Sequence, residues 1–315
     1  MSGCTRQCST FCNISPNFPI QNKGESRLFH LREETEEQDM KRNCRLLIAD
    51  IDLTLVNREK QIMPETRRAM ELLKKNGTML AIASGRPVKV QLINRYKEWG
   101  LPYQFDAVIG LNGGQLYDNI SEQYHEYNVL KKEYIKEIIE FMAPLNLNYF
   151  IYKDGYMLVN RMDEGTKASC LRNNEPAVII DDPSEIWAED TGKLMFRLED
   201  ESQMPEAEAL AAAHPSAHYQ YFKTNPLMLE FQDPANSKGS AMKEFCAMHD
   251  IPLSDVIAFG DTTNDNEMIE YSGTGVCMIN GSDDTKAAAD FITEYDYEHD
   301  GMGRWLMKHV IGEGC

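Results

Sequence analysis

Two carboxylates one residue apart, Asp50 and Asp52, follow an apolar run at residues 46–49. One carboxylate of such a pair can attack phosphorus, while the other protonates the leaving oxygen and later activates water. A carboxylate that approaches a phosphate dianion is repelled, and a divalent cation that bridges the two removes this repulsion. Hard oxygen ligands such as Asp50 and Asp261 suit Mg²⁺. This chemistry requires further acidic residues near Asp50, and the segment 260–265 contains them.

Two other segments offer groups that bind phosphate. Ser84 supplies a hydroxyl, and the backbone around Gly85 supplies N–H groups. Lys238 supplies a fixed positive charge where a helix is predicted to begin at Ser240, and helix N-termini attract anions. Together these groups could hold the equatorial oxygens of a phosphoryl group during in-line transfer.

The predicted strands explain how such distant residues could meet. Asp50, Ser84 and Asp261 each stand at the end of a short apolar run that predicts a buried parallel strand. Helical periodicity separates these runs, which predicts an α/β fold with a Rossmann-like, doubly wound parallel sheet. In such sheets, ligands bind beyond the carboxyl ends of the strands. The predicted strands are 45–50, 78–83, 107–109, 256–259 and 275–278, and the predicted helices are 66–75, 88–99, 240–249 and 266–271.

The strand and helix pattern changes between residues 124 and 223. Helical stretches at 132–142 and 205–213 lie among alternating, strand-like stretches at 148–152, 156–159, 194–198 and 218–222. This mixture predicts an inserted α+β cap domain over 124–223. The catalytic core is then formed by residues 43–123 and 224–315.

The N-terminal residues 1–42 are predicted to form a tail. This stretch is polar, contains Pro16 and Pro19, and lacks the hydrophobic centre of a signal peptide. Cys4, Cys8 and Cys12 have a four-residue spacing that could indicate a metal or redox cluster. The surrounding Ser, Thr, Asn and Pro residues favour a flexible segment instead.

Composition narrows the classes of partner. The 315 residues carry a formal net charge of −18, which disfavours binding to nucleic acid or to anionic membranes. No apolar run approaches the roughly 18 residues of a membrane span. The eight cysteines, in a chain without an export signal, indicate reduced thiols and a cytoplasmic location. The expected partner is a small phosphorylated substrate, and the oligomeric state stays open.

The ordered set of motifs resembles the haloacid dehalogenase (HAD) superfamily, and within it the Cof-type branch. The resemblance covers about Cys44 to Val310 and rests on four segments. They are Asp50-Ile51-Asp52-Leu53-Thr54, Ser84-Gly85-Arg86-Pro87, Lys238-Gly239 and Gly260-Asp261-Thr262-Thr263-Asn264-Asp265. The gap between Asp52 and Ser84 is too short for a domain, whereas the gap between Arg86 and Lys238 is long. The insertion therefore resembles the type II α/β cap of the Cof-type branch.

This resemblance implies a role for each matching residue. Asp50 would be the nucleophile and Asp52 the general acid and base. Mg²⁺ would be held by the Asp50 carboxylate, the Asp52 main-chain carbonyl and Asp261, with Asp265 supporting the metal from behind its ligands. The phosphate contacts would come from Thr54, Ser84, Gly85, Lys238 and Asn264. Arg86, Asn112 and Gly113 would lie at the interface between cap and core.

The expected function is a Mg²⁺-dependent phosphatase of small phosphorylated metabolites that acts through an aspartyl phosphate. A phosphomutase and a non-catalytic sugar-phosphate sensor are the alternatives. Ordinary structural roles are also open: Ser84 and Asp265 could cap helices, and Arg86 could pack against the cap instead of contacting substrate. One departure from the family pattern is Leu53, at a position where the family usually has Gly. Gly permits backbone angles that Leu resists, so we expect Leu53 to reshape or stiffen this turn.

Overall fold

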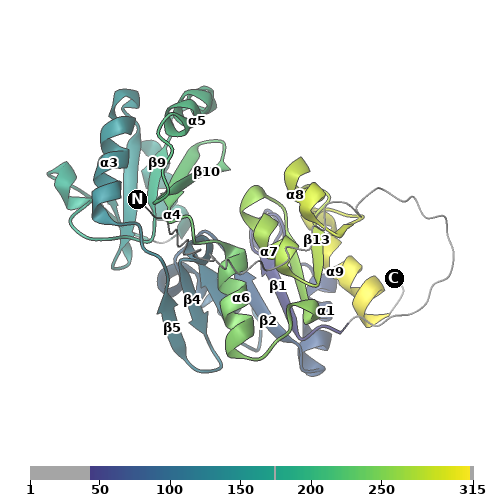
Figure 1. The fold of residues 1–315 in the computed structure, drawn as a ribbon. Coiled ribbons are helices and arrows are strands. Elements are labelled where there is room, and N and C mark those ends of the chain that lie inside the picture. The colour runs from purple at the N-terminus through teal and green to yellow at the C-terminus, as the bar shows by residue number, and fades with distance from the viewer. Residues whose placement is uncertain (1–42, 174, 313–315) are drawn as a thin grey trace, which may run out of the picture. The chain divides into compact units, whose positions relative to one another are not determined.

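The computed structural model describes residues 43–173 and 175–312. The predictions for the N-terminal tail, including Cys4, Cys8 and Cys12, therefore lie outside the described residues. Two sheets organise the rest of the chain (Figure 1). Among the described residues, none of the helices has the length and apolar character needed to cross a bilayer.

The first sheet has eight strands in the order β14-β13-β12-β1-β2-β3-β4-β5. The pairs from β14 to β3 are parallel, and β4 and β5 add an antiparallel edge. The strands are β1 (Leu46–Asp50), β2 (Met79–Ala83), β3 (Ala107–Gly110), β4 (Gln115–Asp118), β5 (Gln123–Glu126), β12 (Val256–Gly260), β13 (Thr274–Cys277) and β14 (Phe291–Ile292). This arrangement confirms the predicted Rossmann-like α/β core.

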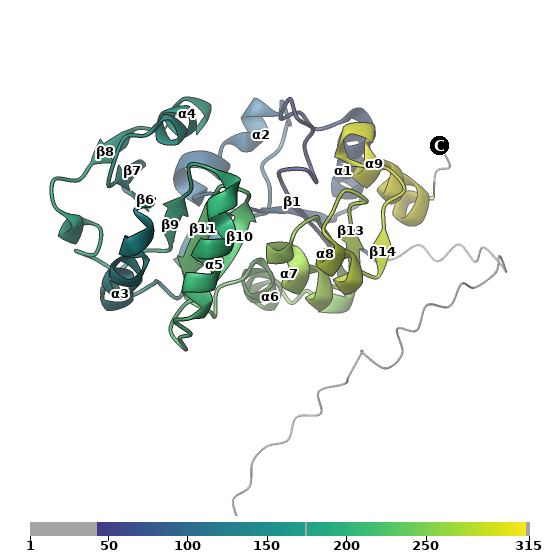
Figure 2. The ribbon, with the colours of Figure 1, turned by 90° about the horizontal axis from the view of Figure 1, so that it is seen from above.

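Helices cover both faces of this sheet, as the two ribbon views show (Figures 1 and 2). The side chains of β1 alternate between the faces: Leu47 and Ala49 join the cluster that contains α1 and α9, whereas Leu46 and Ile48 join the cluster that contains α6. Burial on both faces explains why this strand reads as a continuous apolar run. The helices are α1 (Pro64–Lys75), α2 (Arg95–Glu98), α6 (Lys238–Met248), α7 (Asn266–Tyr271), α8 (Asp283–Ala288) and α9 (Gly301–Leu306).

The segment 88–99 is not the single helix that its periodicity predicts. It forms a π-type turn at Val88–Leu92 and only a short α2. Asn94 lies at the break, where its φ of −102° and ψ of 3° leave the helical region. Asn and the nearby β-branched residues have lower helix propensity than straight-chain residues, which lowers the cost of this break.

The second sheet has six strands in the order β10-β11-β9-β6-β7-β8, mostly antiparallel. Helices α3 and α5 pack on one face through a large apolar cluster. Its strands are β6 (Asn148–Lys153), β7 (Tyr156–Val159), β8 (Ala177–Ile179), β9 (Leu194–Arg197), β10 (Gln220–Asn225) and β11 (Met228–Gln232), and its helices are α3 (Lys132–Met142), α4 (Glu164–Asn173) and α5 (Met204–Ala212). An α+β cap is therefore present. Since β11 belongs to it, the cap sheet extends past residue 223, where the sequence pattern had suggested a return to the core.

Candidate active site

Asp50 ends β1 and lies beside a buried lysine. Lys238 Nζ donates to Asp50 Oδ1 at 2.5 Å and to Asp265 Oδ1 at 2.7 Å, and the lysine is 1% exposed. Lys238 is the first residue of α6, and Ser237 caps this helix by accepting from the Ser240 backbone N–H at 2.9 Å. The Ser237 hydrogen bond fixes where α6 begins, and so fixes where the Lys238 ammonium meets Asp50.

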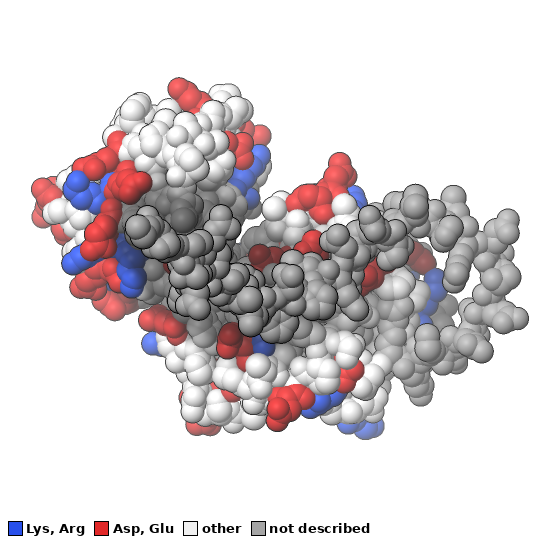
Figure 3. Space-filling model, viewed as in Figure 1, with Lys and Arg blue, Asp and Glu red and all other residues white. Residues whose placement is uncertain are grey.

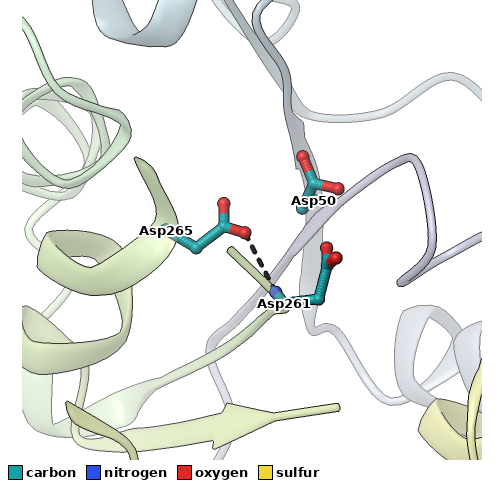
Figure 4. A group of neighbouring side chains, drawn as sticks. All are labelled: Asp50, Asp261 and Asp265. Carbon is teal, nitrogen blue, oxygen red and sulfur yellow. Dashed lines mark hydrogen bonds between the residues drawn. The ribbon is translucent and has the colours of Figure 1, made fainter. Parts of the chain in front are cut away.

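Two further carboxylates come from the segment after β12 (Figure 4). Oxygens of Asp50, Asp261 and Asp265 lie within 4.8 Å of one another. Asp265 Oδ2 accepts from the backbone N–H groups of Asp261 at 3.0 Å and Thr262 at 3.1 Å, and its Oδ1 faces Lys238. Protein donors thus already engage both oxygens of Asp265. This arrangement suits a residue that holds Asp261 in place better than one that binds a metal directly.

Burial and mutual repulsion raise the pKa values of Asp50 and Asp261. Desolvation raises the pKa of Asp50 well above its usual range; Lys238 opposes this effect, and the charges of Asp265 and Asp261 add to it. Desolvation and the neighbouring Asp265 raise the pKa of Asp261 to about 7. When all three carboxylates are ionised, the cluster carries more negative charge than Lys238 balances. A buried set of hard oxygen ligands with excess negative charge fits a divalent cation such as Mg²⁺.

Asp52 has a different environment from Asp50. Arg86 Nη2 donates to Asp52 Oδ2 at 2.8 Å and to Oδ1 at 3.1 Å, and Lys60 Nζ donates to Oδ1 at 2.5 Å. Burial alone would raise the pKa of Asp52, but the charges and hydrogen bonds of Arg86 and Lys60 outweigh it and lower the pKa. In this state Asp52 is ionised. Arg86, whose role the sequence left open, is therefore an ion-pair partner of Asp52.

A cavity of about 880 Å³ lies beyond the carboxyl ends of these strands. The first sheet and its loops contribute Asp50, Asp52, Ser84, Gly85, Arg86, Asp261 and Asn264, all predicted from the sequence. The second sheet contributes aromatic, apolar and charged side chains, among them Phe150, Tyr152, Lys193, Met195, Arg197 and Glu230. The structure thus brings three distant core segments to one cavity, with the cap sheet as its opposite wall.

Some predicted site residues do not line this cavity. Thr54 is buried and its hydroxyl donates to Asp261 Oδ1 at 3.0 Å, so it orients a carboxylate in this structure. Lys238 and Asp265 lie behind Asp50 and Asp261. The expected phosphate contacts of Thr54 and Lys238 stay predictions.

Asn112 and Gly113 lie in a left-handed turn after β3. Leu111, Asn112 and Gly113 have φ values of 47°, 53° and 102°. The turn passes so close to α6 that a Cβ on Gly113 would lie 1.9 Å from the carbonyl oxygen of Ser237. Asn112 is 1% exposed; its Oδ1 accepts from Asn264 Nδ2 at 3.1 Å and its Nδ2 donates to Glu230 Oε2 at 3.3 Å. Asn112 therefore joins core and cap, whereas Gly113 packs against Ser237 of the core.

The sequence reasoning missed Lys60, Lys193 and Glu230. A signal for Glu230 was present, because it stands inside an apolar strand, Met228–Gln232, in which every residue is buried. Charged residues are rarely fully buried unless they are paired. Such a residue predicts an ion-pair partner, and Lys193 is that partner at 2.7 Å.

Leu53 adopts a left-handed backbone conformation that glycine tolerates better than leucine. Its φ is 65°, and 43% of it is exposed beside the cavity. Its carbonyl accepts from Asn280 Nδ2 at 3.1 Å. A left-handed conformation costs a non-glycine residue roughly 1–2 kcal/mol. The turn after Asp52 is therefore left-handed at Leu53, and the leucine backbone is strained there.

We expect Leu53→Gly to raise the free energy of unfolding by about 1 kcal/mol, because relief of backbone strain exceeds the extra entropy of Gly in the unfolded chain. Urea titration measures this change. Glu122→Gly is the matched control, since Glu122 also has a positive φ, 57°, in the exposed turn between β4 and β5. Stabilisation by Glu122→Gly with a loss of stability in Leu53→Gly would show that the Leu53 side chain contributes packing that outweighs the strain.

Comparison with known proteins identifies the family. A family model described as haloacid dehalogenase-like hydrolase matches residues 47–306, so the chain belongs to this family, and its Cof-type branch is confirmed. The Escherichia coli pyridoxal phosphate phosphatase is 27% identical to the chain over 85% of this chain and 99% of that protein. The Bacillus subtilis 5-amino-6-(5-phospho-D-ribitylamino)uracil phosphatase YitU is 23% identical over 84% of this chain and 97% of its own length.

A solved structure supports the fold. The chain matches a sugar phosphatase of HAD subclass IIB with a TM-score of 0.70 and 22% identity, over 84% of this chain and 98% of that one. At this identity the likeness establishes the fold alone. The family match and the related phosphatases place this chain among the HAD-like phosphatases.

Proposed function

We propose that the chain is a Mg²⁺-dependent phosphatase that hydrolyses a small phosphorylated metabolite, a sugar phosphate or a similar phosphomonoester, through an aspartyl phosphate. The observation that carries this proposal is the Asp50 carboxylate. It lies at the carboxyl end of β1, within the carboxylate cluster and at the wall of a cavity that also presents Ser84 and Gly85. Related phosphatases support the class of reaction.

Asp50 and Asp261 would hold the metal with the main-chain carbonyl of Asp52. When bound, the cation lowers the repulsion between the Asp50 carboxylate and the phosphate. Ser84, Gly85 and Asn264 would bind phosphate oxygens at the cavity wall. Asp50 attacks phosphorus, the bond to the leaving oxygen breaks, and Asp52 gives that oxygen a proton. Asp52 then takes a proton from the water that cleaves the aspartyl phosphate.

Asp52 must gain a proton before it can act as the acid. Arg86 and Lys60 hold it ionised in the present structure. Arg86 lines the same cavity, so an anionic substrate competes with Asp52 for its guanidinium. This competition would raise the pKa of Asp52 at the moment when a proton donor is needed.

A phosphate-release screen tests the proposal. The full chain is incubated with hexose phosphates, nucleotides, flavin mononucleotide and pyridoxal phosphate, in Mg²⁺ and in EDTA. We expect release of inorganic phosphate from at least one compound, loss of release in EDTA, and recovery when Mg²⁺ is restored. Absence of release from every compound, or release that EDTA leaves unchanged, would contradict the proposal. An isomerised hexose phosphate without free phosphate would identify a phosphomutase.

A further inference from the structure

A buried ion pair in the cap lies next to the predicted phosphate site. Lys193 Nζ and Glu230 Oε2 are 2.7 Å apart, and their side chains are 3% and 8% exposed. Burying two charges costs several kcal/mol per ion, and mutual attraction offsets this cost only when further hydrogen bonds satisfy both groups. The other hydrogen-bond partners of Lys193 and Glu230 therefore indicate the role of this ion pair.

The additional partner of Lys193 is the backbone of the core. Lys193 Nζ donates to the carbonyl oxygen of Gly85 at 2.7 Å. That carbonyl and the N–H of Arg86 belong to one planar peptide unit and point in opposite directions. The Arg86 N–H donates to Ser84 Oγ at 3.3 Å. When Lys193 fixes the carbonyl, it also fixes the donor that faces the Ser84 hydroxyl.

This contact determines how Ser84 can serve a ligand. A hydroxyl has one O–H donor and can accept through its lone pairs. With the backbone N–H of Arg86 directed at Ser84 Oγ, the oxygen acts as an acceptor there. Its own O–H is then available to donate, and Ser84 lines the cavity. A phosphate oxygen is an acceptor, so this is the polarity that phosphate binding requires.

Glu230 reaches the core by a second route. Its Oε2 accepts from Asn112 Nδ2 at 3.3 Å, and Asn112 Oδ1 accepts from Asn264 Nδ2 at 3.1 Å. The carboxylate can only accept, so it sets which end of the Asn112 amide faces the cap and which faces Asn264. Thr224 donates to the other oxygen, Glu230 Oε1, at 3.1 Å. Both oxygens of the buried carboxylate are thus satisfied.

We propose that Lys193 and Glu230 are positioning residues for phosphate binding: the cap ion pair holds the Gly85–Arg86 peptide and the Asn112 amide so that Ser84 and Asn264 are presented to the cavity. The inference rests on the proposed function, because that function defines the phosphate site. The cap would then help to bind the phosphoryl group that is transferred, and not only the leaving group. The effect of the pair is therefore the same whatever alcohol leaves.

Lys193→Met tests the kinetic consequence, since Met keeps most of the side-chain volume and removes the ammonium. We expect kcat/KM to fall by about 100-fold, the scale on which small misplacements act. The fall should be equal for 4-nitrophenyl phosphate and for a metabolite from the screen, and the inhibition constant of inorganic phosphate should rise. Lys153→Met is the matched control, because Lys153 forms a surface ion pair with Glu189 in the same sheet at 3.4 Å. Its kinetics should equal those of the wild type.

Two kinetic outcomes would overturn the inference. A loss confined to one substrate would show that Lys193 contacts a leaving group. A lower melting temperature with unchanged kcat/KM would show that the pair only stabilises the cap. Glu230→Gln, which keeps the size of the side chain and removes its charge, gives a second test if Lys193→Met fails to fold. It should show the same substrate-independent loss.

Hydrogen exchange separates this inference from the proposed function, because it needs no substrate. We expect the amide of Arg86 to exchange faster in Lys193→Met than in the wild type, while the amides of β9 keep their protection. Unchanged exchange at Arg86 overturns the positioning role. Faster exchange at Arg86 in a protein that releases no phosphate from any compound would overturn the proposed function, while still showing that Lys193 holds the Gly85–Arg86 peptide in place.

Discussion

Asp50→Asn is expected to lose phosphate release almost completely, because an amide cannot attack phosphorus as a carboxylate does. Loss of a nucleophile typically costs a factor on the order of 10⁴–10⁶ in kcat. Single-turnover assays with a substrate from the screen measure this loss. In the wild type, acid quenching during turnover followed by mass spectrometry of peptides should find a phosphoryl group on Asp50.

Asp106→Asn is the matched control for this substitution. Asp106 is partly buried and is also paired with a lysine, Lys74 at 2.9 Å. It precedes β3, however, and so lies at the amino ends of the parallel strands, away from the site. Its variant should keep wild-type turnover. If Asp50→Asn turned over at a rate close to that of the wild type, Asp50 could not be the nucleophile, even if Mg²⁺ dependence were retained.

Lys238→Met should produce the largest loss of stability. Removal of one partner from a buried ion pair costs about 3–5 kcal/mol, because the remaining charge is left uncompensated. Here two carboxylates, Asp50 and Asp265, would lose the same ammonium. Urea titration in EDTA at pH 8 measures the deficit relative to the wild type. We expect phosphate release to be lost as well, since the geometry of Asp50 depends on this contact.

The loss in free energy of unfolding caused by Lys238→Met should become smaller as the pH falls. The folded pKa of Asp50 is already raised above 3.8, and Lys238 opposes that rise, so the variant has a still higher folded pKa. A folded pKa above the unfolded value means that the folded state binds protons more tightly, which favours folding at lower pH. The difference from the wild type should therefore be largest at pH 8 and smaller at pH 5. The double variant Lys238→Met/Asp50→Asn should recover part of the loss; no recovery would assign the loss to packing instead.

The positions of the chemical groups at the strand ends could be predicted because they follow from local patterns. The apolar runs before Asp50, Ser84 and Asp261 fix three parallel strands, and parallel strands bring their carboxyl ends to one edge. The surroundings of Asp52 could not be predicted. Its ionisation depends on Arg86 and Lys60, and which side chain turns toward it is decided by packing, which sequence spacing does not record.

The cap illustrates a second limit. Helix α4 has almost no amphipathic pattern, since Glu164–Asn173 contains Gly, Thr, Lys and Ser where a buried stripe would be apolar. Periodicity therefore did not predict it. The link from Lys193 to Gly85 spans 108 positions and joins the two sheets. Contacts of this kind depend on how one domain packs against another, and neither domain's own pattern contains that information.

The chain carries a formal net charge of −18. On the visible described face in Figure 3, acidic side chains are spread over the surface and the basic ones form smaller groups. The cavity, in contrast, places the basic residues Arg86, Lys193, Arg197 and Lys223 in the same lining as the carboxylates of Asp50, Asp52 and Asp261.

The close contact of Gly113 with Ser237 has a consequence for how charge is balanced at Asp50. The two residues touch through their main chains, and α6 carries Lys238 immediately after the contact. The distance between the start of α6 and the Gly113 turn thus affects how closely the Lys238 ammonium approaches Asp50. A single methyl group at position 113 would force the turn and the helix end apart, and any shift of the helix end would draw the Lys238 ammonium away from Asp50. A residue with no side chain therefore helps to set how far the Lys238 side chain reaches.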